Sequence, residues 1–78
     1  MNIKTAAKET RKLIGAAKLP VLGDTHCDRE HLFSMVDRIV SGEVSREKAL
    51  RWLGWIQACI VLGGSGTVYD MKAINKEA

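Results

Sequence analysis

The stretch Ala49–Leu62 limits the possible folds of this chain more than any other. It reads ALRWLGWIQACIVL, holds both tryptophans and is the longest apolar run in the sequence. It is too short to cross a bilayer, which takes about 20 apolar residues in a helix. We therefore expect a helix buried on most of its circumference, with the rest of the chain arranged to cover it.

The chain has 78 residues, one proline and 46% apolar side chains. This length allows one domain, and the composition is that of a globular protein. The predicted fold is all-α, a small bundle of three main helices plus a short C-terminal helix. Residues 1–26 form a basic helix and linker, and residues 27–78 form the helical core of the single domain 1–78.

Apolar residues recur at three- and four-residue steps, which predicts helices over residues 2–18 and 28–41 and from Ser45 to Leu62. The apolar face of the first helix is mostly alanine, so we expect it to be the least firmly held element. Gly54 costs about 0.8–1 kcal/mol inside a helix, which predicts a close approach by another backbone. The short last helix has Val68, Met71 and Ile74 as its apolar face and should fray from Asn75.

The predicted helix ends carry recognisable caps. Asp28, Ser45 and Thr67 each precede a helix, where a side-chain oxygen accepts a hydrogen bond from a free backbone N–H. Thr67 and Asp70 also have the spacing of a capping box. Gly42 stands where a left-handed residue ends a helix.

The positive charge is concentrated at the N-terminus. Residues 1–18 carry a net charge of +4, and the remainder sums to −1 of the chain's +3. The basic side chains are Lys4, Lys8, Arg11, Lys12 and Lys18. Such a face can bind nucleic-acid phosphates or an acidic protein surface, and the alternative is a solvated face. A helix-turn-helix is disfavoured, because its second helix would be the most apolar in the chain.

The segments His31-Leu32-x-x-Met35, Arg51-Trp52-Leu53-Gly54-Trp55-Ile56-Gln57 and Thr67 through Met71 to Ile74-Asn75 resemble a group of short bacteriophage and prophage proteins. The resemblance covers residues 31–75, and Ala58 replaces a glycine that is usual in the pattern. It implies an all-helical phage accessory protein without known enzymatic activity. It supplies no catalytic residues, and residues 1–26 lie outside it.

His26, Cys27 and His31 are the residue types that bind zinc, and Cys27 is a candidate reactive thiol. Adjacent ligands rarely reach one ion, and Cys59 is placed in the core by the helical pattern. A polar loop that leads into a capped helix is the competing interpretation. We therefore predict no metal, no cofactor and no enzyme. Gly63–Thr67 lacks the lysine of a phosphate-binding loop and is interpreted as a turn.

Trp55 lies beside the main apolar stripe of its helix. It either packs on the first helix or anchors an interface, as exposed tryptophans often do. A homodimer through this surface is a candidate for so short a chain.

We therefore expect a small phage protein that binds a host protein in the host cytoplasm, as an inhibitor of a host defence complex such as a CRISPR effector. A nucleic-acid-binding or transcription-modulating protein that uses the basic first helix is the alternative. No membrane association is expected.

Overall fold

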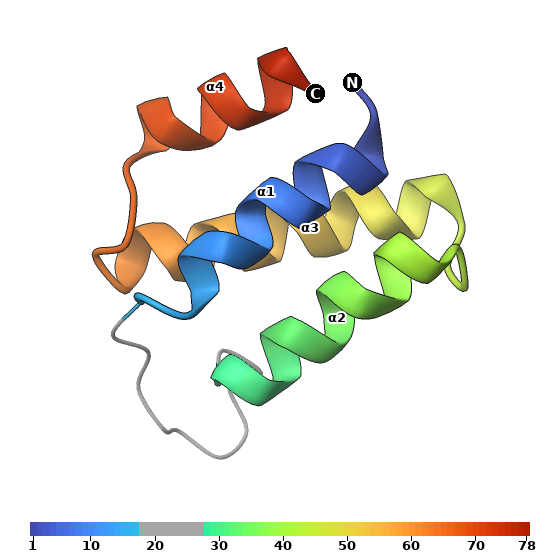
Figure 1. Ribbon diagram of the computed structural model, residues 1–78, viewed down its shortest axis with the longest axis horizontal. Helices are drawn as coiled ribbons and strands as arrows, with labels where there is room; N and C mark the ends of the chain where they lie inside the picture. The colour runs from blue at the N-terminus through green and yellow to red at the C-terminus, as the bar shows by residue number, and fades with distance from the viewer. Residues whose placement is uncertain (18–27) are drawn as a thin grey trace.

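Four helices make up the part of the chain that the structure, a computed structural model, describes, which is residues 1–17 and 28–78. They are α1 (Ile3–Ile14), α2 (Arg29–Ser41), α3 (Arg46–Leu62) and α4 (Val68–Glu77). Helix α3 lies behind α1, with α2 and α4 on either side (Figure 1). The all-α prediction, with a short C-terminal helix, is confirmed. None of the helices in these two ranges has the length and apolarity needed to span a membrane.

The predicted caps position the helices. The side chains of Asp28, Ser45 and Thr67 accept hydrogen bonds from the backbone N–H three residues later and begin α2, α3 and α4. The Thr67 backbone N–H donates to the Asp70 carboxylate at 2.8 Å, which completes the capping box. Gly42 ends α2 with φ at 84°, the left-handed conformation that favours glycine.

Helix α1 ends at Ile14, short of the predicted residue 18. Gly15 follows, and other segments provide partners for the carbonyl groups at this end. The Ser65 hydroxyl donates to the Leu13 carbonyl at 2.6 Å, and Arg29 donates to the Ala17 carbonyl at 3.1 Å. These bonds replace the helical hydrogen bonds that a longer helix would have made.

Helix α1 is the central helix of the fold, because it packs against α2, α3 and α4 (Figure 1). Its inner residues Ala6, Ala7, Thr10 and Ile14 have no exposed surface. The prediction that α1 is the least firmly held element was therefore wrong. Its alanines bury little area each, but their small size lets neighbouring helices approach closely.

Helix α3 is buried on one side only, which contradicts the prediction of nearly complete burial. Its inward side comprises Ala49, Leu53, Ile56, Cys59 and Ile60. On the outer side Trp55 is 44% exposed and Leu62 is 86% exposed. Trp52, predicted to be a core residue, is half-buried, and Arg38 and Lys48 each lie 5.0 Å from its ring.

Helix α4 is held along its length rather than frayed from Asn75. The Asn75 and Gln57 amides exchange two hydrogen bonds, of 2.8 and 3.0 Å. The Asn2 backbone N–H donates to the carbonyl of Ala78 at 2.8 Å, so the two termini lie together (Figure 1). Val68 was predicted to be on the packed face, but it is exposed.

Candidate functional site

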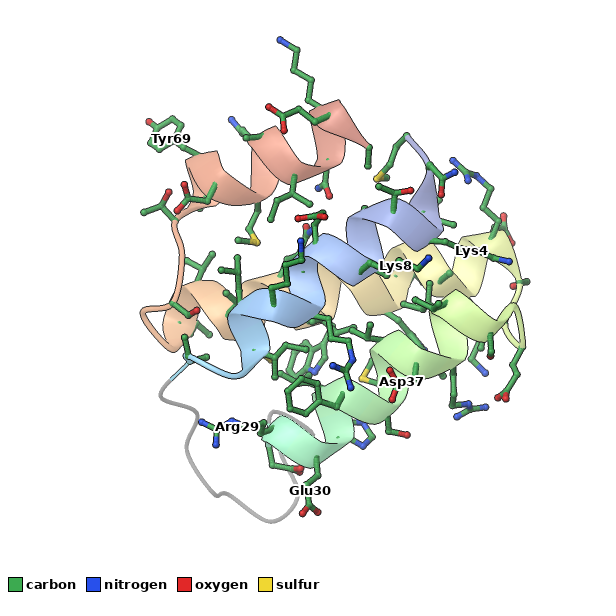
Figure 2. The ribbon with its side chains drawn as sticks, in the orientation of Figure 1. Lys4, Lys8, Arg29, Glu30, Asp37 and Tyr69 are labelled. Atoms are coloured by element: carbon green, nitrogen blue, oxygen red, sulfur yellow. The ribbon has the colours of Figure 1, made fainter. Side chains whose placement is uncertain are left out.

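The basic side chains of α1 are exposed, but two of them are already paired with acids. Arg11 lies 3.1 Å from Asp37 of α2, and Lys12 lies 3.0 Å from Glu9. Lys4 and Lys8 make no ion pair with any described residue, and they extend from α1 on the face that Figure 2 presents. Lys18 lies outside the described residues. Of the four described residues of the predicted basic face, Lys4 and Lys8 are therefore the two without an ion pair.

Arg11 also covers the ring of Phe33, with its guanidinium carbon 4.6 Å from the ring centre. One arginine therefore joins α1 to α2 through both a carboxylate and an aromatic ring. The planar guanidinium of arginine can stack on an aromatic ring and pair with a carboxylate at the same time. Its charge is partly neutralised by Asp37. We therefore assign Arg11 to the packing of α1 on α2 and not to the binding of a partner.

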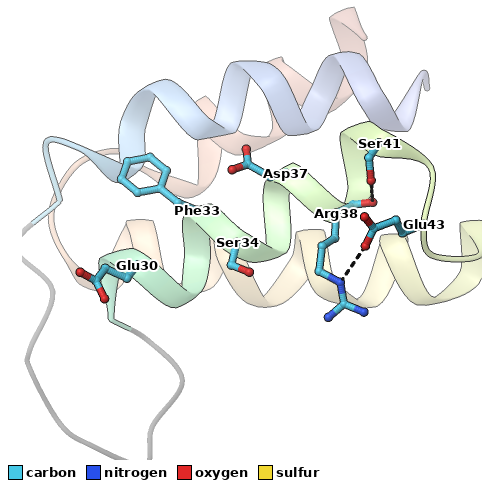
Figure 3. Close-up of a pocket in the computed structure, with 7 residues that line it drawn as sticks. All are labelled: Glu30, Phe33, Ser34, Asp37, Arg38, Ser41 and Glu43. Carbon is cyan, nitrogen blue, oxygen red and sulfur yellow. Dashed lines mark hydrogen bonds and ion pairs between the residues drawn. The ribbon is translucent and has the colours of Figure 1, made fainter.

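The outer side of α2 carries a shallow hollow of about 580 Å³ beside Phe33 (Figure 3). Its charged side chains are largely neutralised within the fold, since Asp37 pairs with Arg11 and Glu43 pairs with Arg38 at 3.3 Å. The Ser41 hydroxyl donates to the Arg38 carbonyl, which leaves it engaged with backbone. The hollow therefore presents an ordinary polar helix surface. Its lining residues are Glu30, Phe33, Ser34, Asp37, Arg38, Ser41 and Glu43.

A second hollow lies between α3 and α4 and is almost entirely apolar. This α3–α4 groove has a volume of about 390 Å³, and its lining residues are Gln57, Ala58, Val61, Leu62, Val68 and Met71. Leu62 at 86% and Val68 at 55% exposure form its rim. Trp55 lies one helical turn before Ala58 on the same side of α3. An apolar groove beside an exposed tryptophan is suited to bind an apolar partner surface.

Polar bonds join α4 to α3 beside the groove, in addition to the apolar contacts that Met71 and Ile74 of α4 make with the core. Gln57 is 7% exposed, and its amide donates to Asn75 and to the Thr10 hydroxyl. Thr10 in turn donates to the Ala6 carbonyl at 2.8 Å. These residues join α1, α3 and α4 in one network, in which every buried polar atom of the described side chains has a partner.

The turn between α3 and α4 fixes where the groove begins. A side chain at Gly66 would bring its first carbon within 2.9 Å of the Met71 methyl group and 3.6 Å of Leu13. The absence of a side chain there lets Met71 pack over the turn and keeps the start of α4 close to α1. The sequence indicated a turn here.

Of the three weak metal-ligand candidates, the structure describes only His31. His26 and Cys27 lie outside the described residues, and His31 is half-buried in the first turn of α2, where its backbone N–H donates to Asp28 at 2.8 Å. Cys59 is 1% exposed in the core, as predicted. Across residues 1–17 and 28–78 no group of three His, Cys, Asp or Glu side chains is placed to hold an ion.

Sequence reasoning identified Trp55 but missed the groove beside it. Gln57 offered a signal, because a single amide within an apolar run needs a buried partner. The periodicity of α4 placed Val68 on the packed side and therefore gave no warning that the groove would be open.

No protein-family model, curated protein or solved structure matches this chain. The resemblance to phage proteins therefore stays a prediction. Two segments that carry it meet in the fold, since Gln57 and Asn75 form the amide pair. Within the first of these two segments, Arg51, Gly54 and Trp55 are exposed.

Proposed function

We propose that this chain is a small phage protein that acts by binding a host protein, without catalysis, in the host cytoplasm. Inhibition of a host defence complex, such as a CRISPR effector, is the proposed consequence. The observation that carries the proposal is the α3–α4 groove with Trp55 beside it. A chain of this size that leaves Leu62 and Val68 largely exposed keeps apolar surface that solvent alone does not favour.

The chemistry of the groove supports an apolar contact more than a charged one. Its lining includes one polar side chain, Gln57, whose amide is already bonded to Thr10 and Asn75. Trp55 supplies a large side chain at the edge, the kind of residue that contributes most to protein interfaces. The proposed partner surface is therefore an apolar helix or loop of a host protein.

A capture experiment from host lysate tests the proposal. The immobilised chain should retain a host protein, and Leu62→Glu should lose it, because burying an unpaired charge in an interface is costly. Lys72→Glu, an equally drastic change at an exposed α4 position, is the matched control and should retain it. Failure of the wild-type chain to retain any host protein would contradict the proposal, as would equal retention by Leu62→Glu.

Nucleic-acid binding through α1 is the second candidate, and the exposed, unpaired Lys4 and Lys8 favour it. Phosphate contacts release counterions, so binding should weaken steeply as salt is raised. A gel-shift series over salt concentration tests this. The double change Lys4→Glu and Lys8→Glu should abolish the shift while leaving helix content unchanged. A shift that is insensitive to salt or to both changes would contradict this candidate.

A further inference from the structure

Basic side chains from three helices gather at one end of the molecule. Helices α1 and α3 begin at this end, and α2 finishes there (Figure 1). The Arg46 guanidinium donates to the Met1 carbonyl at 3.3 Å, which joins the start of α3 to the start of α1. The Lys4 ammonium lies beside Gly42, where an added side-chain carbon would be 3.6 Å from it. Cations that are far apart in the sequence therefore share one surface.

This end carries the whole net charge of the chain. Five basic side chains lie in the first two turns of α1, the last turn of α2 and the first turn of α3, against the acids Glu43 and Glu47. Their net charge is +3, the same as that of the full sequence, so the other seven basic and seven acidic residues cancel. The five basic residues are Lys4, Lys8, Arg38, Arg46 and Lys48.

Four of these five cations make no ion pair with a described residue. Arg38 is the exception, because it pairs with Glu43 at 3.3 Å. The neighbouring Asp37 does not lower the charge, since it pairs with Arg11 at 3.1 Å. Only Glu47 opposes the four unpaired cations from within α3. We call this set the basic end, and it comprises Lys4, Lys8, Arg46 and Lys48.

The composition of the basic end favours phosphates over an acidic protein as its partner. Three of its four cations are lysines, which are depleted in protein–protein interfaces, whereas interfaces with nucleic acid are strongly positive. The turn between α2 and α3 exposes Gly42, Glu43 and Ser45 and offers no large apolar side chain as an anchor. A protein partner would need such an anchor at the centre of the contact.

Trp52 holds two cations in place beside this turn. Arg38 from α2 and Lys48 from α3 each lie 5.0 Å from the centre of its half-buried ring. Ordering these long side chains before binding lowers the entropy that binding costs. The ring is thereby engaged, whereas proteins that bind single strands present open rings on which bases stack. A duplex, which displays its phosphates outside the stacked bases, fits this end better.

We infer that the basic end binds the phosphate backbone of a nucleic-acid duplex without reading its bases. Lys4 and Lys8 extend from α1 one turn apart, and Arg46 and Lys48 extend the contact onto α3 (Figure 2). The inference rests on the nucleic-acid candidate proposed above and deepens it, because it adds α3 to the surface and names a duplex as the ligand. It does not involve the α3–α4 groove.

Fluorescence anisotropy with labelled short duplexes tests the inference, with DNA of two unrelated sequences and RNA of one of them. The two DNA sequences should bind equally, and a difference between DNA and RNA would identify the preferred duplex. Affinity should fall about 100-fold between about 50 and 200 mM salt, as expected for four phosphate contacts. Arg46→Gln and Lys8→Gln should each weaken binding about five- to tenfold near 0.1 M salt and reduce the slope of log affinity against log salt by about 0.9.

Lys12→Gln is the matched control, because it removes one charge from the same helix at a cation that Glu9 already pairs. It should bind like the wild type. Circular dichroism checks that each variant folds, and Lys48→Gln replaces Arg46→Gln if loss of the bond to Met1 unfolds the chain. Leu62→Glu should bind the duplex normally, so loss of host-protein capture by that variant bears only on the groove.

Absence of binding to every duplex overturns the inference, as does an equal loss of affinity in Lys12→Gln, which would show that total charge governs binding. Tighter binding of a single strand of the same length also overturns it. If Arg46→Gln and Lys48→Gln bind normally while Lys8→Gln does not, α1 alone carries the nucleic-acid candidate and the inference fails. Capture of an acidic host protein that Arg46→Gln and Lys8→Gln both lose, without duplex binding, would assign this end to a protein partner instead.

Discussion

Helices α1 and α3 exchange the roles that their sequences suggest. Helix α1 has a thin, alanine-rich apolar face, yet it contacts every other helix and buries Ala6 and Ala7 completely. Helix α3 is far more apolar, yet Trp55 and Leu62 lie on its exposed side. The difference shows that the most apolar helix of a chain need not be its central one. Small side chains allow neighbours on several sides, whereas a helix with large side chains on all sides needs more partners than this chain provides.

The two helices should differ most when a large aliphatic side chain is removed from each. Ile14→Ala in α1 should lower the free energy of unfolding by about 2–5 kcal/mol, because the side chain has no exposed surface. Leu62→Ala in α3 should change it by less than about 0.5 kcal/mol, because that side chain is 86% exposed. Urea denaturation at a concentration low enough to keep the chain monomeric measures both.

A similar loss from both changes would mean that Leu62 is covered in solution by part of the same chain. A small loss from Ile14→Ala would mean that α1 is not the central helix. The first result would contradict the exposure of Leu62 on α3, and the second would contradict the central position of α1.

Adding volume should separate the same two helices. Ala7→Leu should destabilise the fold by about 1–3 kcal/mol, because a packed contact has no room for three more carbon atoms. Ala58→Leu should have almost no effect, since Ala58 lies on the exposed side of α3. Thermal unfolding followed by circular dichroism measures both variants. Tolerance of leucine at Ala7 would show that neighbouring helices do not approach α1 closely.

The network that ties α1, α3 and α4 should show a smaller effect. Asn75→Ala leaves the buried Gln57 amide oxygen without its 3.0 Å bond and should cost about 1 kcal/mol. Hydrogen exchange should rise first in α4, which the amide pair holds against α3. Asn2→Ala, which removes only an exposed cap bond, provides a comparison for a polar change outside the network. Unchanged exchange in α4 after Asn75→Ala would mean that apolar contacts hold this helix.

The sequence predicted the helices and most of their ends because these depend on local chemistry. Asp28, Ser45 and Thr67 cap helices through bonds that span three residues. Gly42 ends α2 because its φ of 84° suits a residue without a side chain. Periodicity also identified the buried stripe of α2, whose members Leu32, Met35, Val36 and Ile39 are all buried.

The arrangement of the helices and the candidate site depend on contacts between distant residues, which periodicity does not encode. The Gln57–Asn75 pair joins residues eighteen positions apart, and the Arg11–Asp37 pair joins residues twenty-six apart. The first joins α4 to α3 beside the groove, and the second pairs one cation of the expected basic face with an acid. A helical pattern states which side of a helix is apolar, and it does not state whether the chain has enough mass to cover that side.

The smallest effect is expected at Gly54, inside α3, and it should have the opposite sign to the effect at Gly42, which ends α2. Gly54→Ala should stabilise the monomer by about 0.5–1 kcal/mol, because alanine favours a helix interior and its added carbon meets no described atom within 4 Å. Gly42→Ala should destabilise it by more than about 1 kcal/mol, because φ of 84° strains a residue with a side chain. Thermal unfolding at several dilutions measures both. If Gly54→Ala stabilises the dilute chain but not the concentrated one, the added carbon is tolerated by the fold and opposed by a second molecule. Destabilisation at every dilution would mean that a contact within the same chain requires glycine at this position of α3.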